Sequence, residues 1–423
     1  MRRSFTSSIA VATAANSRFV RSERRTSEAV NPHVDARVAG LEIAVMFMGS
    51  TLLTPLYVIY QRAFGFTEIT LTLVYAVYVV GNLAALFFFG RLSDQVGRRR
   101  VNLSAILLGA TATLLFLGAT STPWLFLGRT LSGLAIGIAS AAATAWVAEL
   151  VTDQPRASTL ATTANLAGIA IGPLLAGLLA QYAPAPLRTT FVVYLMLLAL
   201  VAWRVAFLPE TVPDPLTRLR DVAFRPRLGV PRTIRRTFVA PALAAFAAFA
   251  LGGYYAALAP TLLADDLGIA NSALAGGIVA EFFAVAALAV PATRRLQSHR
   301  AMQAGLLLLV PSVGLLLLAQ ARASLAALFI GSAAGGVALA LGYRGTLQVV
   351  NGLAPADQRA EVIASYMIVC FLGNSLPVIG VGVLSRIAGH VTAHAVFAAT
   401  IAVLAVVAAA AGFRDAKTQA QPG

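Results

Sequence analysis

The chain has 423 residues, of which 58% are hydrophobic and 12% are charged, and its formal net charge is +15. This composition is typical of a membrane protein and argues against a soluble enzyme or binding domain. The single cysteine, Cys370, excludes a disulfide framework and a cysteine-based metal cluster, and the four histidines are scattered. We therefore expect no metal and no cofactor.

Twelve continuous apolar runs are each long enough to cross a bilayer as a helix, which needs about 20 residues. Helices are favoured because lipid offers no partner for backbone polar groups, and the runs lack the alternation of barrel strands. They cover residues 38–60, 67–89, 101–120, 124–147, 160–181, 189–208, 239–263, 271–290, 301–320, 325–350, 362–384 and 393–413. Polar residues interrupt the first and the eighth. The predicted fold is an all-α membrane protein with twelve transmembrane helices.

Arginines alternate from loop to loop along the chain. They gather after the second, fourth, sixth, eighth and tenth runs, whereas the other loops hold only Arg62, Arg188 and Arg322. Because basic loops stay on the cytoplasmic side, we predict that the arginine-rich loops and both termini face the cytoplasm from a cell (inner) membrane. We therefore expect the lipid bilayer to be a partner of this basic protein, and we do not expect it to bind nucleic acid.

A polar segment, rich in proline and arginine, divides the twelve runs into six and six. We expect a disordered cytoplasmic tail over residues 1–37, a six-helix bundle over 38–209, a cytoplasmic linker over 210–237, a second bundle over 238–413 and a tail over 414–423. The sequence "DQPRAS" from Asp153 has a faint echo, "DQRAEV" from Asp357, ahead of the fifth and eleventh runs. Such repetition is typical of transporters built from duplicated bundles.

The loop after the second run reads "GRLSDQVGRRR", residues 90–100. A loop that only anchored the cytoplasmic side would need the arginines alone. Its two glycines, Gly90 and Gly97, allow a tight reversal between helices. Asp94 adds a carboxylate that can form charge-assisted hydrogen bonds with the arginines.

This loop resembles the G-x-L-x-D-r-x-G-r-r motif of the major facilitator superfamily. The matching residues are Gly90, Leu92, Asp94, Gly97, Arg98 and Arg99, with Gln95 replacing a frequent arginine. The resemblance implies two six-helix bundles around a central cavity. It also implies that Asp94 faces the N-terminus of the eleventh helix, where an anion is stabilised, and that Gly90, Asp94, Gly97, Arg98 and Arg99 form a conformational latch between the halves.

Two further stretches resemble motifs of the same family. In "GRTLSGLAIG", residues 128–137, the pattern is carried by Arg129, Gly133 and Gly137. Glycines at every fourth position favour close helix packing, whereas Arg129 either reaches the membrane surface or takes part in binding or coupling.

The second stretch, "GIAIGPLLAG", covers residues 168–177 and resembles in part a fifth-helix signature associated with exporters. The matching residues are Gly168, Gly172, Pro173 and Gly177, and Ala176 replaces one glycine of the signature. A proline within a helix removes a backbone hydrogen bond and bends the helix. The partial match favours export.

Acidic residues inside the runs are candidates for proton coupling. Glu281 lies roughly 15 Å below the start of its helix, near the bilayer centre, where burial disfavours the charged carboxylate. The alternative is that Glu281 is permanently neutral and structural. The rival, Glu42, lies about one turn from the cytoplasmic end of its helix, within reach of water. Residues that line a cavity or simply pack include Asn165, Tyr57, Tyr254, Tyr255 and Asn374.

The predicted function is secondary active transport of a small solute by alternating access. The sequence contains no G-x-x-x-x-G-K-[ST] nucleotide loop, and the resemblance implies coupling to protons. Efflux of a drug-like or metabolic compound is the first hypothesis and proton-coupled uptake by a symporter the second. A transporter-like membrane sensor or assembly factor without transport is the third. We expect that the protein is not an enzyme, that its partners are a small-molecule substrate, protons and the lipid bilayer, and that it is a monomer.

Overall fold

The computed structural model describes residues 32–213, 215–216, 228–355 and 358–419, and every regular element in these ranges is a helix. Twelve helical segments there are long and apolar enough to cross a membrane, which confirms the predicted class and number of spans. The remaining parts of the predicted tails and linker, residues 1–31, 214, 217–227 and 420–423, lie outside the described residues.

The helices of the first bundle are α2 (Pro32–Thr51), α3 (Tyr57–Phe64), α4 (Glu68–Phe89), α6 (Arg98–Leu117), α7 (Thr122–Leu150), α8 (Gln154–Tyr182) and α9 (Pro186–Ala206). The second bundle holds α10 (Arg235–Thr261), α11 (Ser272–Ala292), α12 (Ser298–Arg322), α13 (Leu325–Leu353), α14 (Arg359–Ala388) and α15 (His390–Gln419). A short helix, α5 (Leu92–Val96), lies between α4 and α6. Residues 32–37 and 414–419 of the predicted tails are therefore helical.

Local chemistry sets several helix boundaries. The side chains of Asp153, Asn271 and Ser324 each accept a hydrogen bond from a backbone N–H in the first turn of the following helix, which satisfies a group that has no partner within the helix. The first span is broken at Pro55, which lacks an N–H and sits in a 3-10 turn, Thr54–Leu56. The eighth predicted run, by contrast, forms the unbroken helix α11.

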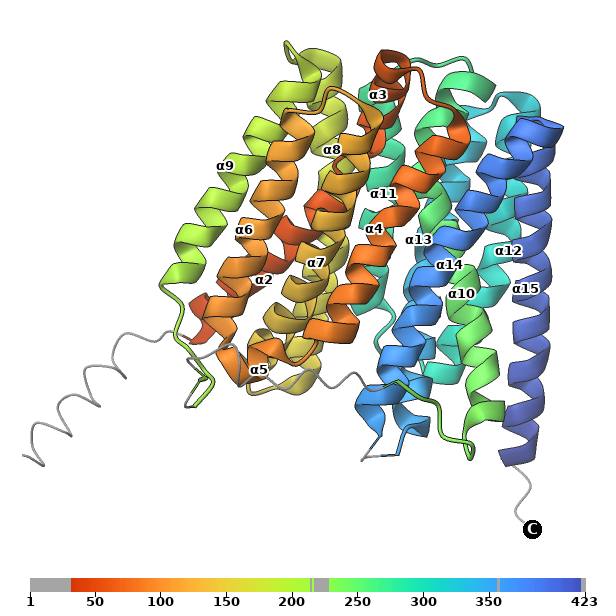
Figure 1. Ribbon diagram of the computed structural model, residues 1–423. Helices are drawn as coiled ribbons and strands as arrows, with labels where there is room; N and C mark the ends of the chain where they lie inside the picture. The colour runs from red at the N-terminus through yellow and green to blue at the C-terminus, as the bar shows by residue number, and fades with distance from the viewer. Residues whose placement is uncertain (1–31, 214, 217–227, 356–357, 420–423) are drawn as a thin grey trace, which may run out of the picture.

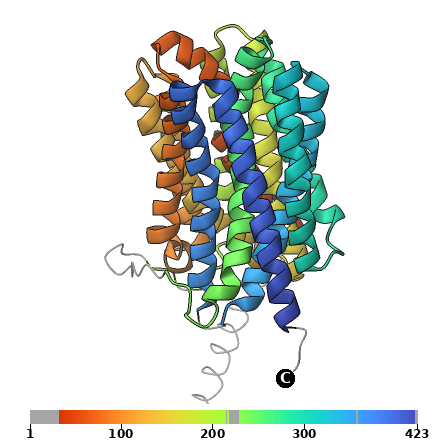
Figure 2. The ribbon, with the colours of Figure 1, turned by 90° about the vertical axis from the view of Figure 1, so that its right-hand side faces the viewer.

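The two bundles stand side by side, with α5 at one end of the molecule and α3 at the other (Figure 1). We call these the α5 end and the α3 end. The bundles meet where α8 packs against α11 and where α4 packs against α14. Figure 2 shows α14 and α15 at the front of the molecule, with the first bundle's α4 beside them.

Four polar pairs join the bundles in the part of the helices nearer the α3 end. The Thr54 hydroxyl donates to the Ala256 carbonyl (2.7 Å), and the Ser272 amide donates to the Gln181 side chain (3.0 Å). The other two pairs are Asn374 with Tyr75 and His390 with Glu68. The bundles are thus joined at the α3 end in this conformation.

Candidate functional site

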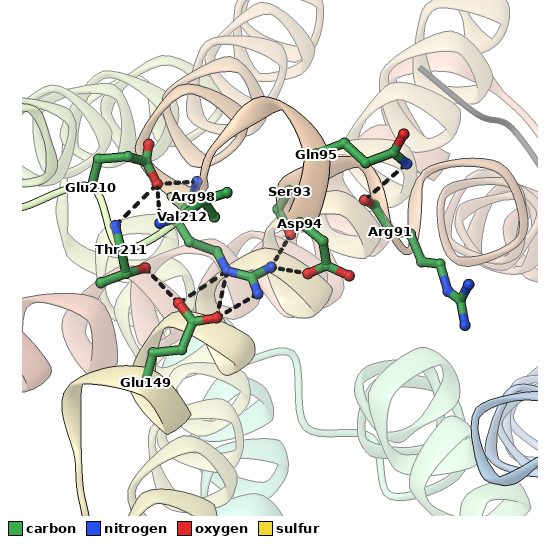
Figure 3. Close-up of polar contacts among 9 residues, drawn as sticks. All are labelled: Arg91, Ser93, Asp94, Gln95, Arg98, Glu149, Glu210, Thr211 and Val212. Atoms are coloured by element: carbon green, nitrogen blue, oxygen red, sulfur yellow. Dashed lines mark hydrogen bonds and ion pairs between the residues drawn. The ribbon is translucent and has the colours of Figure 1, made fainter. Parts of the chain in front are cut away.

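The loop that carries α5 is organised around the side chain of Arg98 (Figure 3). Its guanidinium binds the Glu149 carboxylate at the end of α7 through Nε (3.2 Å) and Nη2 (2.6 Å). It also donates to the Ser93 hydroxyl (2.6 Å) and to the Asp94 carboxylate. Arg98 is 6% exposed, so these charge-assisted bonds compensate a nearly buried cation.

A second carboxylate fixes the start of α6. Glu210 accepts hydrogen bonds from the backbone N–H groups of Arg98 (2.7 Å), Arg99 (3.2 Å) and Thr211 (3.2 Å). An anion is stabilised there because the first N–H groups of a helix lack partners within it. Gly97 has a φ of +109°, and a Cβ at this position would lie 2.5 Å from a Glu210 oxygen. The positive φ favours glycine at residue 97, whereas Gly90 has an ordinary helical φ of −56°.

Asp94 contacts a residue of its own bundle. Its carboxylate pairs with Arg98, and its side chain is 52% exposed. The proposed latch between Asp94 and the N-terminus of α14 stays a prediction. Sequence reasoning missed Glu149 and placed Glu210 only at the start of the linker.

The glycines of α7 bring that helix against α4. A Cβ added at Gly133 would lie 2.0 Å from the Tyr78 carbonyl oxygen, and one added at Gly137 would lie 2.5 Å from the Ala85 side chain. The close helix approach predicted from the spacing is present. Its consequence is that α7 carries Arg129 directly into the interior beside α4.

Arg129 is completely buried, which excludes the interpretation that it reaches the membrane surface in this conformation. Its Nη1 donates to the Ser50 carbonyl (2.8 Å), and its guanidinium carbon lies 5.7 Å and 5.0 Å from the ring centres of Tyr75 and Tyr78. These are cation–π contacts. Its Nε has no hydrogen-bond partner, and no carboxylate among the described residues pairs with it. A buried cation without a fixed anion is a candidate site for an anionic group.

The Arg129 site extends to the other bundle through one hydrogen bond. The Asn374 amide of α14 donates to the Tyr75 hydroxyl (2.9 Å). Asn374 was predicted to line a cavity or to pack, and here it connects α14 to the ring that covers Arg129. Tyr75 was missed because nothing in the local sequence distinguishes it from an ordinary packing residue.

The glycines and proline of α8 serve two different contacts. Gly168 and Gly172 face α2, where a Cβ would lie 2.1 Å and 2.4 Å from backbone oxygens. Gly177 faces the second bundle, where a Cβ would lie 2.5 Å from the Ser272 carbonyl oxygen. Gly276 of α11 lies against the carbonyl of Pro173 in the same way. The exporter-like segment is therefore part of the interface between the bundles.

Glu281 does not lie on the side of α11 that faces α8. Its carboxyl contacts the Ser332 hydroxyl of α13, and it shares a helix face with Gly277 and with Leu288, which is 71% exposed. The Tyr255 ring stacks on the neighbouring Phe282 (4.6 Å between ring centres). Glu281 lies midway along α11 (Ser272–Ala292), at the depth that its position in the run predicts, and its carboxyl is half-buried against α13.

Glu42 differs from its predicted surroundings. It is fully buried, and neither carboxyl oxygen has a hydrogen-bond partner among the described residues, so it does not reach water as expected. The reason is that α2 begins at Pro32 and packs on α7, α8 and α9 around this position. Asn165 is half-buried on α8, one turn before Gly168.

Comparison with known proteins gives a family and a fold. The family model described as Major Facilitator Superfamily matches residues 41–376. Chloramphenicol resistance protein CraA of Acinetobacter baumannii is 28% identical over 164 residues, which are 38% of this chain and 39% of that protein. The mouse solute carrier family 2, facilitated glucose transporter member 10, is 38% identical over 138 residues, which are 32% of this chain and 24% of that protein. The chain thus matches less than half the length of these relatives.

A solved structure shares the fold along most of the chain. The bacterial homologue of the human lysosomal transporter Spinster, in an inward-facing and unoccupied conformation, superposes with a TM-score of 0.72 at 18% identity. The match covers 92% of this chain and 97% of that one.

Proposed function

The chain belongs to the Major Facilitator Superfamily, and from this premise we propose that it is a proton-coupled exporter of a drug-like or metabolic compound. The α5 end faces the cytoplasm in this proposal. Support comes from the arginines, since Arg91, Arg98, Arg99 and Arg100 lie at the α5 end while the loops at the α3 end are poor in basic residues.

The observation that carries the proposal of export is the position of the α8 motif. Gly177 and Pro173 contact α11 across the interface between the bundles. Alternating access requires the bundles to rock about such an interface. The proline bends α8, and its glycines carry no side chain, so that the backbones of α8 and α11 approach closely there. The resistance function in the name of CraA, a relative at 28% identity, points in the same direction.

Proton coupling is assigned to Glu281, with Glu42 as the second candidate. The Ser332 hydroxyl lies within hydrogen-bond distance of both the Glu281 carboxyl and the Phe329 carbonyl (3.1 Å). A hydroxyl has one hydrogen to donate. When Glu281 is protonated, it donates to Ser332, which donates to Phe329. When Glu281 is ionised, Ser332 turns its hydrogen to the carboxylate. A single hydroxyl rotation thus accommodates both states.

Arg129 is assigned a role in binding or coupling, because its buried charge has only a carbonyl and ring faces for partners. An anionic group on a substrate, or a carboxylate that approaches in another conformation, would lower the cost of that burial.

The test is flux of chloramphenicol into proteoliposomes whose lumen is more acidic than the medium. An antiporter accumulates the compound in the lumen as protons leave, and Glu281→Gln should abolish this accumulation while counterflow without a gradient persists. Asp153→Asn, at the exposed start of α8, is the control and should behave as the wild type. Uphill transport with unchanged pH dependence in Glu281→Gln would make that residue structural. If the wild type does not transport chloramphenicol, the same assay is repeated with a panel of drug-like compounds.

Uptake by proton symport is the second candidate, favoured by the similarity to a facilitated glucose transporter. The sign of the flux separates the two functions. Under the same gradient a symporter drives its substrate out of the lumen instead of into it.

A further inference from the structure

Six charged or titratable side chains gather at the α3 end, where the bundles are joined. We call them the α3-end cluster: Glu68, Asp265, Asp266, Arg386, His390 and His394. Glu68 belongs to the first bundle and the other five to the second. None was selected as a candidate from the sequence, because they come from distant segments.

One ion pair of the cluster crosses between the bundles. The His390 Nδ1 lies 3.1 Å from a Glu68 carboxylate oxygen. His394, in the next turn of α15, lies 3.5 Å from Asp266 and shares a hydrogen bond of 2.7 Å with the buried Tyr254 hydroxyl. Asp266 also accepts a hydrogen bond from Gln320 (3.0 Å). His394 and Asp266 are therefore held within the second bundle, and His390 alone among the histidines of the cluster bridges the gap.

A cavity of about 250 Å³ opens beside the ion pair and is lined by Glu68, Asp265, Arg386, His390, Thr261 and Ser385, among others. The hydroxyl of Thr261 is buried and has no hydrogen-bond partner among the described residues. The His390 side chain is 44% exposed. Water, and with it protons, thus has access to His390 from the α3 end.

The charge balance of the closed α3 end depends on the histidines. Glu68, Asp265 and Asp266 carry three negative charges when ionised, while Arg386 supplies one positive charge, so the cluster has an excess of two negative charges when both histidines are neutral. Glu68 then faces two carboxylates of the other bundle, which repel it. Protonation of His390 adds an attraction to Glu68 across the interface, which offsets this repulsion.

We propose that His390 and Glu68 form a proton-binding gate, in which uptake of a proton from the α3 side closes that end of the transporter. His390 begins α15, and the start of a helix does not favour a cation. A protonated His390 therefore depends on the carboxylates around it, and Glu68 reaches it only when the bundles are joined at this end. The closed conformation binds the proton more tightly than the open one, so protons favour closure.

This gate deepens the proposed function and rests on it for its biological direction. In a proton-driven exporter, the compound leaves from the outward-open state, and a proton from outside then returns the protein to the inward-open state. Closure of the α3 end on proton binding is that return step. Histidine suits this task because its charge changes between about pH 5 and pH 8.

The test measures the gate without any transport. Nitroxide labels are placed by Ala63→Cys on α3 and Val391→Cys on α15, both exposed positions, in a Cys370→Ser background in lipid nanodiscs. Pulsed electron spin resonance gives the closed and open fractions between pH 5.5 and pH 8.5. We expect the closed-to-open ratio of the wild type to rise about fivefold or more on acidification, within the usual range of coupling between sites.

His390→Gln should remove most of this pH response, and Glu68→Gln should remove it as well, because either change ends the titratable attraction across the gap. His299→Gln is the matched control, since His299 is exposed at the start of α12 on the opposite end. A pH-independent wild type, an unchanged response in His390→Gln, or a response lost in His394→Gln but kept in His390→Gln would overturn the gate. The proposed function is tested separately by the flux assay. A failure of export or of proton coupling in that assay would leave the distances between the nitroxide labels unchanged.

Discussion

The contact between Gly276 and Pro173 allows a direct test of whether the α3 end opens during transport. Gly276→Ala adds a Cβ that would lie 2.1 Å from the Pro173 carbonyl oxygen and 3.0 Å from its carbonyl carbon. Even close C–H···O contacts keep about 3.3 Å between carbon and oxygen. The two helices must therefore separate by roughly 1 Å at this point, and both contact atoms belong to backbone that yields little.

Overpacking of this kind costs about 1–3 kcal/mol. Because Gly276 contacts Pro173 across the joined α3 end, the added methyl group destabilises mainly the conformation described here, in which that end is closed. We expect Gly276→Ala to shift the equilibrium toward opening of the α3 end by about 5- to 150-fold.

The assay is the rate at which a membrane-impermeant thiol reagent modifies Thr261→Cys in a Cys370→Ser background. Thr261 is 5% exposed and lines the cavity at the α3 end, so its labelling reports opening. Gly277→Ala is the matched control, since nothing lies within 4 Å of a Cβ at that position. Labelling of Gly276→Ala at the rate of Gly277→Ala would refute the reasoning, because it would show that α8 and α11 absorb the methyl group without opening.

Three further predictions concern the loop at the α5 end, Glu281 and the orientation in the membrane. Asp94→Asn should leave the amount of protein in the membrane unchanged but slow transport, because the latch at the closed α5 end loses its carboxylate; wild-type flux in the purified variant would contradict this. Glu281→Gln should retain counterflow and lose the dependence of flux on the proton gradient, measured in the same liposomes. Single cysteines introduced at Ser121 and Ala270 should react with an impermeant reagent in intact cells, whereas one at Ser93 should not; labelling of Ser93→Cys would reverse the orientation.

The number and class of helices were predictable because each span must supply its own apolar length. The close packing predicted for two glycines also holds, since Gly133 and Gly137 lie against α4. In these cases spacing within one helix determines what it can approach. Helix boundaries were less predictable. The fifth run was predicted to begin at residue 160, whereas α8 begins at Gln154, within a polar stretch. Its N-cap residue is Asp153, whose carboxylate accepts a hydrogen bond from the Arg156 backbone N–H.

The candidate site was only partly predictable, since polar partners come from distant helices. The sequence singled out Arg129 and Arg98 but not Tyr75 or Glu149, which lie tens of residues away from them in the chain. Glu42 shows the same difficulty for burial, because its distance from the start of α2 does not reveal that α7, α8 and α9 surround it. Periodicity indicates which face of a helix is apolar, but the partner of a polar residue depends on tertiary packing.

Side chains on one face of α4 contact both His390 of the gate and the buried Arg129. Glu68, Thr72 and Tyr75 occupy positions i, i+4 and i+7 of α4. Each contacts the second bundle: Glu68 pairs with His390, Thr72 lies against Gly382, and Tyr75 accepts a hydrogen bond from Asn374.

Because α4 is a continuous helix, separation of the bundles at the α3 end breaks these three contacts together. Tyr75 then loses its bond to Asn374, and its ring is free to move from the guanidinium of Arg129, which keeps its hydrogen bond to Ser50 on α2. A proton bound at His390 holds the same face of α4 in place and keeps Arg129 covered. In the proposed gate, α4 therefore links the Glu68–His390 pair to the buried Arg129, because it contacts both.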